Sequence, residues 1–130
     1  MAQIKHVAMM VRDAEKTADF YERIFNLRRV SQRDGGDIIK AKVIDLSDGT
    51  LNVTLICPEE QSEHRDWVYK TWGVNHIGFV VDDFKGTIAK LRESGINVPQ
   101  NPPKPFFKFR DMNGTEIDVA GPEYAEWTTG

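Results

Sequence analysis

Two histidines and one aspartate are the residues of this chain whose types and spacing could do chemistry. His6 and His76 lie 70 positions apart, and each opens a matching stretch of sequence. Asp118 lies in a later stretch, at 116–120, that reads as a strand. Two imidazoles and one carboxylate with open coordination positions suit a divalent ion such as iron(II), manganese or zinc. Such an ion acts as a Lewis acid that chelates adjacent substrate oxygens and stabilises an enolate or an oxygen adduct.

An internal repeat supplies the elements that position these residues. His-Val-Ala-Met-Met-Val-Arg-Asp at 6–13 matches His-Ile-Gly-Phe-Val-Val-Asp-Asp at 76–83 position by position, and a turn sequence at 48–49 corresponds to one at 113–114. Two matches in the same order indicate one module present twice. We expect module 1–57 and module 73–122, joined by a polar linker over 58–72, to form one domain of the 130-residue chain.

Each module reads as a strand, a helix and three further strands. Apolar residues at helical spacing predict helices over 14–25 and 84–94, and Asp13 and Asp83 can cap their first turns. Gly95 stands where a helix C-terminus favours a left-handed residue. Strand patterns follow at 27–32, 38–46 and 51–56 in the first module, and at 97–98, 106–110 and 116–120 in the second. The predicted fold is α+β, with two βαβββ modules.

Alternation along the strands predicts which side chains share a face. The bulky apolar residues that alternate with the histidines should pack on the helices, so the histidines should face the concave side of the sheet. That side should receive His6, His76, Asp118 and either Asn52 or Thr54. A strict offset of 65 residues would instead pair Asp118 with Val53. We prefer the alternation, because a one-residue difference in the turn reconciles the two.

Further residues could contact a ligand on the concave side. The predicted substrate-binding residues are Asn52, Thr54, Met10, Trp72 and Phe107. For the aromatic residues among them, the alternative is a place in the core or in a dimer interface. Lys108 could meet an anionic substrate group, or could belong to a solvated strand face. Glu116 shares a face with Asp118 but lies next to the turn, so we expect it to be solvated. No general base is identified.

Composition excludes some classes of partner. The formal net charge of -3 and the isoelectric point near 5.6 argue against binding to nucleic acid or an anionic membrane, both of which favour basic patches. Cys57 is the single cysteine, so no disulfide can form within the chain. No apolar run approaches the roughly 20 residues that span a bilayer. We therefore expect a cytoplasmic protein with a small-molecule ligand or substrate.

Four stretches in this order resemble the vicinal oxygen chelate superfamily, which includes glyoxalases, bleomycin-resistance proteins and extradiol dioxygenases. They are His-Val-Ala-Met-Met-Val-Arg-Asp at 6–13, Phe-Tyr-Glu-Arg-Ile-Phe-Asn-Leu at 20–27, Val-Asn-His-Ile-Gly-Phe-Val-Val-Asp-Asp at 74–83 and Asp-Met-Asn-Gly-Thr-Glu-Ile-Asp-Val at 111–119. The last resembles the family's final Gly-x-x-Ile-Glu-Leu strand. The resemblance covers essentially the whole chain and is specific for the fold rather than for a substrate.

The resemblance implies that the two modules pair into an incomplete barrel around a cleft, and that the protein forms a homodimer. It also implies a divalent metal held by the first and last strands of each module, which gives His6, His76 and Asp118 as ligands. The fourth ligand position, often Glu or Gln in the family, falls on Asn52 or Thr54. Asp118 stands where Glu is usual, and its shorter side chain changes the reach.

Two functions follow from this interpretation. The first is a metal-dependent lyase, isomerase or ring-cleaving dioxygenase that acts on a small substrate with vicinal oxygens and uses iron(II), manganese, zinc or nickel. The second is a metal-free protein that sequesters a small molecule, as bleomycin-resistance proteins do, with His6 and His76 as buried, hydrogen-bonded residues. The set of His6, His76 and Asp118 favours the first function, and the missing fourth ligand favours the second.

Overall fold

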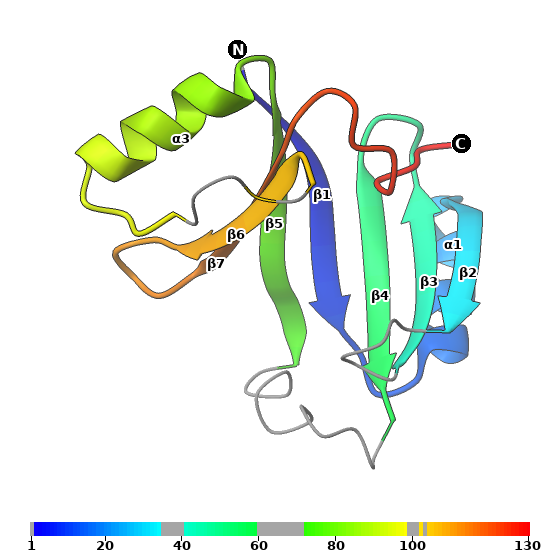
Figure 1. Cartoon of the computed structure of the whole chain (residues 1–130). Coiled ribbons are helices and arrows are strands. Elements are labelled where there is room, and N and C mark those ends of the chain that lie inside the picture. Colours follow the sequence, from blue (N-terminus) through cyan, green and yellow to red (C-terminus); the bar gives the residue numbers. More distant parts are fainter. Residues whose placement is uncertain (1, 35–40, 60–71, 99–101, 103) are drawn as a thin grey trace. The chain divides into compact units, whose positions relative to one another are not determined.

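The computed structural model describes residues 2–34, 41–59, 72–98, 102 and 104–130 (Figure 1). Its elements follow the chain in the order β1 Ala2–Met10, α1 Ala14–Phe25, β2 Arg28–Asp34, β3 Ala41–Ser47, β4 Asn52–Pro58, β5 Gly73–Val81, α3 Phe84–Glu93, β6 Phe106–Arg110 and β7 Glu116–Ala120. None of the helices among the described residues has the length and apolar character needed to cross a membrane.

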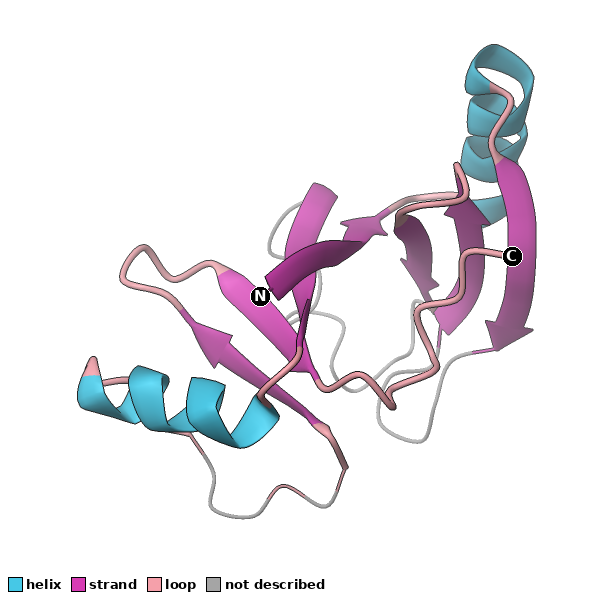
Figure 2. Cartoon of the chain, turned by 90° about the horizontal axis from the view of Figure 1, so that it is seen from above, coloured by secondary structure: helices cyan, strands magenta, loops and turns pink. Residues whose placement is uncertain are grey.

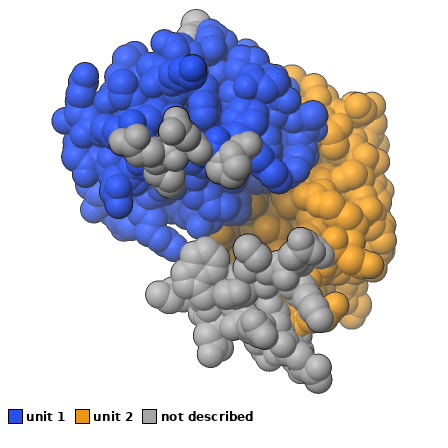
Figure 3. Space-filling view, in the orientation of Figure 1, with its two compact units in different colours: residues 1–6, 76–127 blue, residues 7–75, 128–130 orange. Residues whose placement is uncertain are grey.

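The chain divides into two compact units, which Figure 3 shows in different colours. Unit 1 comprises residues 1–6 and 76–127, and unit 2 comprises residues 7–75 and 128–130. The division falls inside β1 and β5, so that His6 and His76 both belong to unit 1. Most of the predicted linker over 58–72 lies outside the described residues, and the module boundaries 1–57 and 73–122 stay a prediction.

In unit 1, β7 lies between β5, with which it pairs in parallel, and β6, with which it pairs antiparallel. Figure 2 shows α3 as a helix alongside the strands of this unit. A buried apolar cluster of this unit is formed by Val81, Ile88, Val98, Phe107, Ile117 and Val119. Ile77 and Phe79 of β5 pack against the same cluster. Because neighbouring residues of a strand point to opposite faces, His76 faces away from this core, as the alternation predicted.

The ends of α3 follow the sequence prediction. The Asp83 side chain accepts a hydrogen bond from the Gly86 N–H at 3.0 Å, which caps the first turn. At the other end Gly95 has a φ of 87°, and the Ile96 N–H donates to the Leu91 carbonyl at 2.9 Å. This left-handed turn, which glycine adopts without strain, leads the chain out of the helix.

The strand predicted at 97–98 is wrong, because these two residues belong to no strand. Val98 is buried in the cluster of unit 1, and its carbonyl oxygen accepts a hydrogen bond from the Arg92 guanidinium at 3.2 Å. The apolar character that suggested a strand thus serves the core, and a side chain from α3 satisfies the Val98 carbonyl in place of a neighbouring strand.

In unit 2, β3 pairs antiparallel with β2 on one side and with β4 on the other. Strand residues pack with α1 around an apolar cluster made of Val11, Ala14, Ala18, Ile44, Leu46 and Leu55. Val53 of β4 packs against this cluster, whereas the alternating residues Asn52 and Thr54 are buried on the other face. The alternation was therefore the correct guide to the facing of β4, and the strict offset was not.

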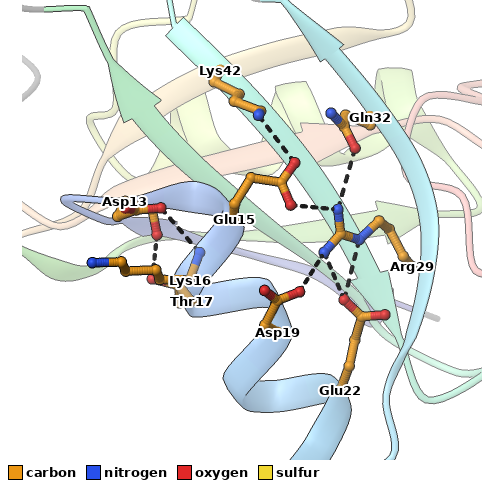
Figure 4. Close-up of polar contacts among 9 residues, drawn as sticks. All are labelled: Asp13, Glu15, Lys16, Thr17, Asp19, Glu22, Arg29, Gln32 and Lys42. Carbon is orange, nitrogen blue, oxygen red and sulfur yellow. Dashed lines mark hydrogen bonds and ion pairs between the residues drawn. The ribbon is translucent and has the colours of Figure 1, made fainter.

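Ion pairs link side chains of α1 to Arg29 of β2, as Figure 4 shows. The Arg29 guanidinium lies 2.9 Å from a Glu15 carboxylate oxygen, 2.7 Å from Glu22 and 3.3 Å from Asp19. Three carboxylates on α1 therefore share one cation on β2. The first turn of α1 is capped by Asp13, whose carboxylate accepts from the Lys16 N–H at 2.9 Å.

Candidate metal centre

His6, His76 and Asp118 lie together in unit 1. His6 comes from β1, His76 from β5 and Asp118 from β7, and all three are buried, with exposures of 4%, 7% and 2%. The His6 Nε2 atom lies 3.3 Å from His76 Nε2, which in turn lies 3.2 Å from an Asp118 carboxylate oxygen. One potential ligand atom from each residue lies within 4.8 Å of the others. The three side chains predicted as metal ligands thus converge.

The register between β5 and β7 explains how two of these side chains meet. His76 is paired with Glu116, and Gly78 is paired with Asp118. Glu116 and Asp118, two residues apart on β7, point to the same face as His76. The histidine therefore lies within reach of both carboxylates, while the intervening Ile117 enters the core on the opposite face.

Glu116 is part of the site, and the prediction that it is solvated was wrong. Its side chain is only 13% exposed, and one carboxylate oxygen lies 3.1 Å from His76 Nδ1. The pairing of Glu116 with His76 on a parallel strand carries the carboxylate inward. A carboxylate that holds one ring nitrogen fixes the orientation of the ring and directs the other nitrogen at its ligand. Here that other nitrogen, Nε2, is directed at His6 and Asp118.

The charges of this cluster shift its ionisation. Burial alone would lower the pKa of His76, but hydrogen bonds to Asp118 and Glu116 outweigh burial and raise that pKa. The hydrogen bond to His76 lowers the pKa of Glu116. Burial works to raise the pKa of Asp118, yet contacts with His76 and Lys108 lower it overall. In the absence of a metal, the two carboxylates therefore favour a proton on His76.

Lys108 completes the cluster at its exposed side. Its ammonium lies 2.9 Å from the second Asp118 oxygen and 3.9 Å from Glu116, and the lysine side chain is 44% exposed. Lys108 is paired with Asp118 across the antiparallel β6–β7 ladder, which accounts for the contact. The lysine holds one carboxylate oxygen of Asp118 and leaves the other toward His76.

The donor set fits a divalent metal ion. Two donor atoms that each lie about 2.1 Å from one ion are about 3.0 to 3.4 Å apart in octahedral or tetrahedral coordination. The distances of 3.3 Å and 3.2 Å around His76 Nε2 fall in this range. Two imidazole nitrogens and a carboxylate oxygen are donors that iron(II), manganese, zinc and nickel accept. His6, His76 and Asp118 could therefore bind a metal ion.

Comparison with known families agrees with the fold. Residues 3–122 match the model of the Glyoxalase/Bleomycin resistance protein/Dioxygenase superfamily. The chain belongs to this superfamily. The resemblance found in the sequence is thereby confirmed, and so is the predicted α+β fold of two βαβββ-type modules. Among curated proteins, no relative matches the chain.

Solved structures of similar fold cover nearly the whole chain. A hypothetical protein from Bacillus halodurans C-125 has a TM-score of 0.76 and 18% identity, over 95% of this chain and 96% of that one. A selenomethionine methylmalonyl-CoA epimerase has a TM-score of 0.72 and 20% identity, over 91% and 93%. A Streptomyces coelicolor methylmalonyl-CoA epimerase variant, in complex with 2-nitronate-propionyl-CoA, has a TM-score of 0.71 and 19% identity, over 94% of this chain and 98% of that one. At such identities the likeness shows the fold.

The two candidates for the superfamily's fourth ligand position, Asn52 and Thr54, belong to unit 2. The Asn52 amide donates to the Thr128 carbonyl at 2.9 Å, and the Thr54 hydroxyl donates to an Asp45 oxygen at 2.6 Å. Asp45 is fully buried and also accepts hydrogen bonds from Ser31 and Arg33. Within unit 2, these side chains therefore form a buried polar cluster around a carboxylate.

Asp45 was not singled out from the sequence. Its signal was available, since a lone aspartate between Ile44 and Leu46 interrupts an otherwise apolar strand. A buried charge of this kind needs a partner, and Arg33 provides one from the neighbouring strand. The sequence offered no way to tell which of several arginines that partner would be.

The other predicted ligand-contacting residues occupy different environments. Met10 is buried, with 1% exposure, and lies in unit 2. Trp72 is half-exposed and lies under the Arg12 guanidinium, 4.4 Å from the ring centre. Phe107 packs edge-on against Phe84 of α3, with ring centres 5.4 Å apart, inside the core of unit 1. Phe107 therefore serves the core on the face opposite His76, and we leave it out of the candidate site.

The pKa shifts predict how the stability of the metal-free protein depends on pH. Because the folded-state pKa of His76 is raised, its contribution is complete below its ordinary value of about 6.5 and is lost as pH rises through the folded value. Because the pKa values of Glu116 and Asp118 are lowered, their contribution is present above about pH 4.5 and is lost as pH falls further. The cluster should stabilise most between these limits.

Urea unfolding in the presence of a chelator, at pH 5.5 and pH 8.5, measures this effect. The parent protein should lose more stability over this range than His76→Gln does, because only the parent carries the titrating ring. His64 is the third histidine of the chain, and a His64→Gln variant controls for the removal of a histidine as such. Equal losses in the parent and His76→Gln would contradict the assignment of the raised pKa to His76.

Proposed function

We propose that this protein is a divalent-metal-dependent enzyme that acts on a small substrate with adjacent oxygen atoms. His6, His76 and Asp118 are the metal ligands in this proposal. The observation that carries it is the position of His76, held at Nδ1 by Glu116 while Nε2 faces the other two candidate ligands. An arrangement of carboxylate, histidine and metal is typical of metal sites in enzymes.

When bound, a divalent ion supplies Lewis-acid chemistry, polarising the substrate oxygens and stabilising the negative charge that develops on them. The residues of the chain supply the binding site for it. Glu116 keeps the His76 ring oriented, and Lys108 keeps one oxygen of Asp118 occupied so that the other faces the histidines. All three ligands are buried, which limits the access of water to their side chains.

The reaction class is a lyase, an isomerase or a ring-cleaving dioxygenase, and we favour the isomerase. Support comes from the structural relatives, several of which are methylmalonyl-CoA epimerases, one in complex with methylmalonyl-CoA. An epimerase moves a proton beside a carbonyl, a reaction in which stabilisation of negative charge on oxygen lowers the barrier. The homodimer and the cytoplasmic location predicted from the sequence are also part of this proposal.

Lys108 supports a substrate that carries a negative charge. With neutral histidines, the carboxylates of Glu116 and Asp118 offset a divalent ion, and the ammonium of Lys108 leaves one positive charge in excess. The lysine side chain is 44% exposed, so its ammonium can meet a solute as well as Asp118. We therefore propose a carboxylate or an equivalent anionic group beside the adjacent oxygens.

The second candidate function is metal-free binding of a small molecule. The observation that favours it is that Asn52 and Thr54 hydrogen-bond within unit 2 and offer no carboxylate as a fourth ligand. In that case His76 carries a proton between its two carboxylates, and the cluster is charge-balanced without a metal. Metal analysis separates the two functions.

We expect the protein to bind one equivalent of a divalent metal ion. Protein purified without added metal, then reconstituted with iron(II), manganese, zinc or nickel and desalted, is analysed for its metal content. A His6→Ala/His76→Ala double variant should retain less than about a tenth of the metal, since it lacks two of the three ligands. A His64→Ala variant serves as the control. Absence of stoichiometric uptake of any of the four metals by the folded parent would sink the enzyme proposal.

Lys108→Met tests the anionic substrate. Oxalate, a small dianion with adjacent oxygens, serves as the probe and is titrated into metal-loaded protein by calorimetry. We expect oxalate to bind about tenfold more weakly to Lys108→Met than to the parent, because one nearby positive charge is lost. Lys104→Met removes an exposed lysine from the same stretch of chain and should match the parent. Equal oxalate affinity in Lys108→Met and the parent would remove Lys108 from the substrate site.

A further inference from the structure

Trp127, beyond the last strand, lies flat against a candidate metal ligand. Its indole ring is stacked on the His6 imidazole, with ring centres 4.8 Å apart and planes inclined by only 4°. Both residues belong to unit 1, and both are buried, with exposures of 9% for Trp127 and 4% for His6. The face of each ring that contacts the other ring is therefore shielded from water.

Gly78 provides the space for this stack. A Cβ atom at position 78 would lie 2.6 Å and 2.8 Å from two atoms of the Trp127 ring, and 3.0 Å from the His6 Cβ. Distances this short require the indole to move. The corresponding residue of the first module is Ala8. The second copy therefore lacks a Cβ atom at the position against which the Trp127 ring lies. The glycine at this position is thus explained by the indole rather than by a turn.

Other aromatic rings hold the indole in place. The Trp127 ring meets Tyr124 edge-on at 5.1 Å and Phe106 edge-on at 6.1 Å, and Tyr124 stacks on Phe106 at 4.9 Å. The segment that carries Trp127 is tied to the start of β6, because the Gly121 N–H donates to the Pro105 carbonyl at 2.8 Å. The position of the indole is therefore fixed by contacts with neighbouring aromatic rings as well as by the backbone that carries it.

A ring stacked in this way limits rotation of His6. Rotation about the bond between Cβ and the imidazole would tilt the ring into the indole plane. The stacked orientation leaves Nε2 directed toward His76 Nε2, 3.3 Å away. Ligands locked by packing bind a metal with a smaller loss of conformational freedom than ligands free to rotate. His76 is held by a carboxylate, and His6 is held by an aromatic face.

We propose that Trp127 positions His6 for metal binding, through the space that Gly78 leaves. This inference rests on the proposed function, since it assigns His6 as a metal ligand. Trp127 is a positioning residue in this account, because no atom of the indole is a metal ligand. The same contact makes the indole a reporter, since a paramagnetic ion bound at His6 should quench its fluorescence.

The experiment compares Ni²⁺ affinity, by calorimetry, in the parent and in Trp127→Ala, Trp127→Phe and Gly78→Ala. Unfolding midpoints of the metal-free proteins are measured alongside. We expect Trp127→Ala and Gly78→Ala to weaken Ni²⁺ binding about tenfold or more, and Trp127→Phe, which keeps a ring on His6, to recover most of it. Tyr21→Phe, on α1 of unit 2, is the matched control and should bind Ni²⁺ as the parent does.

A second readout follows the stack itself. In a Trp67→Phe/Trp72→Phe background, Trp127 is the only tryptophan, and Ni²⁺ should quench its fluorescence in proportion to occupancy. The inference is overturned if Trp127→Ala and Gly78→Ala bind Ni²⁺ as tightly as the parent, or if only their unfolding midpoints fall. If Trp127→Ala does not fold, the Ni²⁺ affinities of Gly78→Ala and Trp127→Phe test the inference in its place. A parent that binds no metal overturns the proposed function itself, which is a different result.

Discussion

The candidate site depends on one histidine held between two carboxylates. Glu116 and Asp118 lie on the same face of β7, and the parallel register with β5 sets His76 beside both. One ring nitrogen meets Glu116 at 3.1 Å, and the other meets Asp118 at 3.2 Å. The orientation of His76, the contact with His6 and the ion pair with Lys108 all follow from this register. A shift by one residue would send both carboxylates into the core.

This arrangement places two negative charges in a buried environment, which is costly unless cations compensate them. Lys108 offers one positive charge from the exposed side. The remaining compensation comes from a proton on His76 or, in the proposed function, from a divalent metal that displaces it. Because the same nitrogen receives the proton or the metal, acid should weaken metal binding.

Much of the architecture could be predicted from the chain alone, because its signals are local. The caps at Asp13 and Asp83, the left-handed Gly95 and the alternation in β1, β4 and β5 depend on neighbours only a few residues away. The convergence of His6, His76 and Asp118 could be anticipated because the repeat places the strands that carry them. The strand expected at 97–98 failed because apolar character alone does not distinguish a short strand from a buried loop residue such as Val98.

The residues that support the ligands were harder to find, because their roles depend on contacts between distant segments. Glu116 was expected to be solvated at a strand end, and only the register with β5 brings it to His76. Trp127 follows the last strand in a stretch with no periodic pattern, and nothing local indicates that it stacks on His6. The one residue in the repeat that reflects this contact is Gly78, which stands where the first copy has Ala8.

The most direct test of this account is the metal affinity of Glu116→Gln, measured by calorimetry with Ni²⁺ or Mn²⁺. The substitution keeps the size of the side chain and removes the charge that holds His76 from Nδ1. Glu93→Gln, at an exposed position of α3, is the matched control. The account predicts that Glu116→Gln binds metal about 10- to 100-fold more weakly than the parent, while Glu93→Gln is unchanged. Equal affinity in Glu116→Gln and the parent would contradict the central role given to the histidine between two carboxylates.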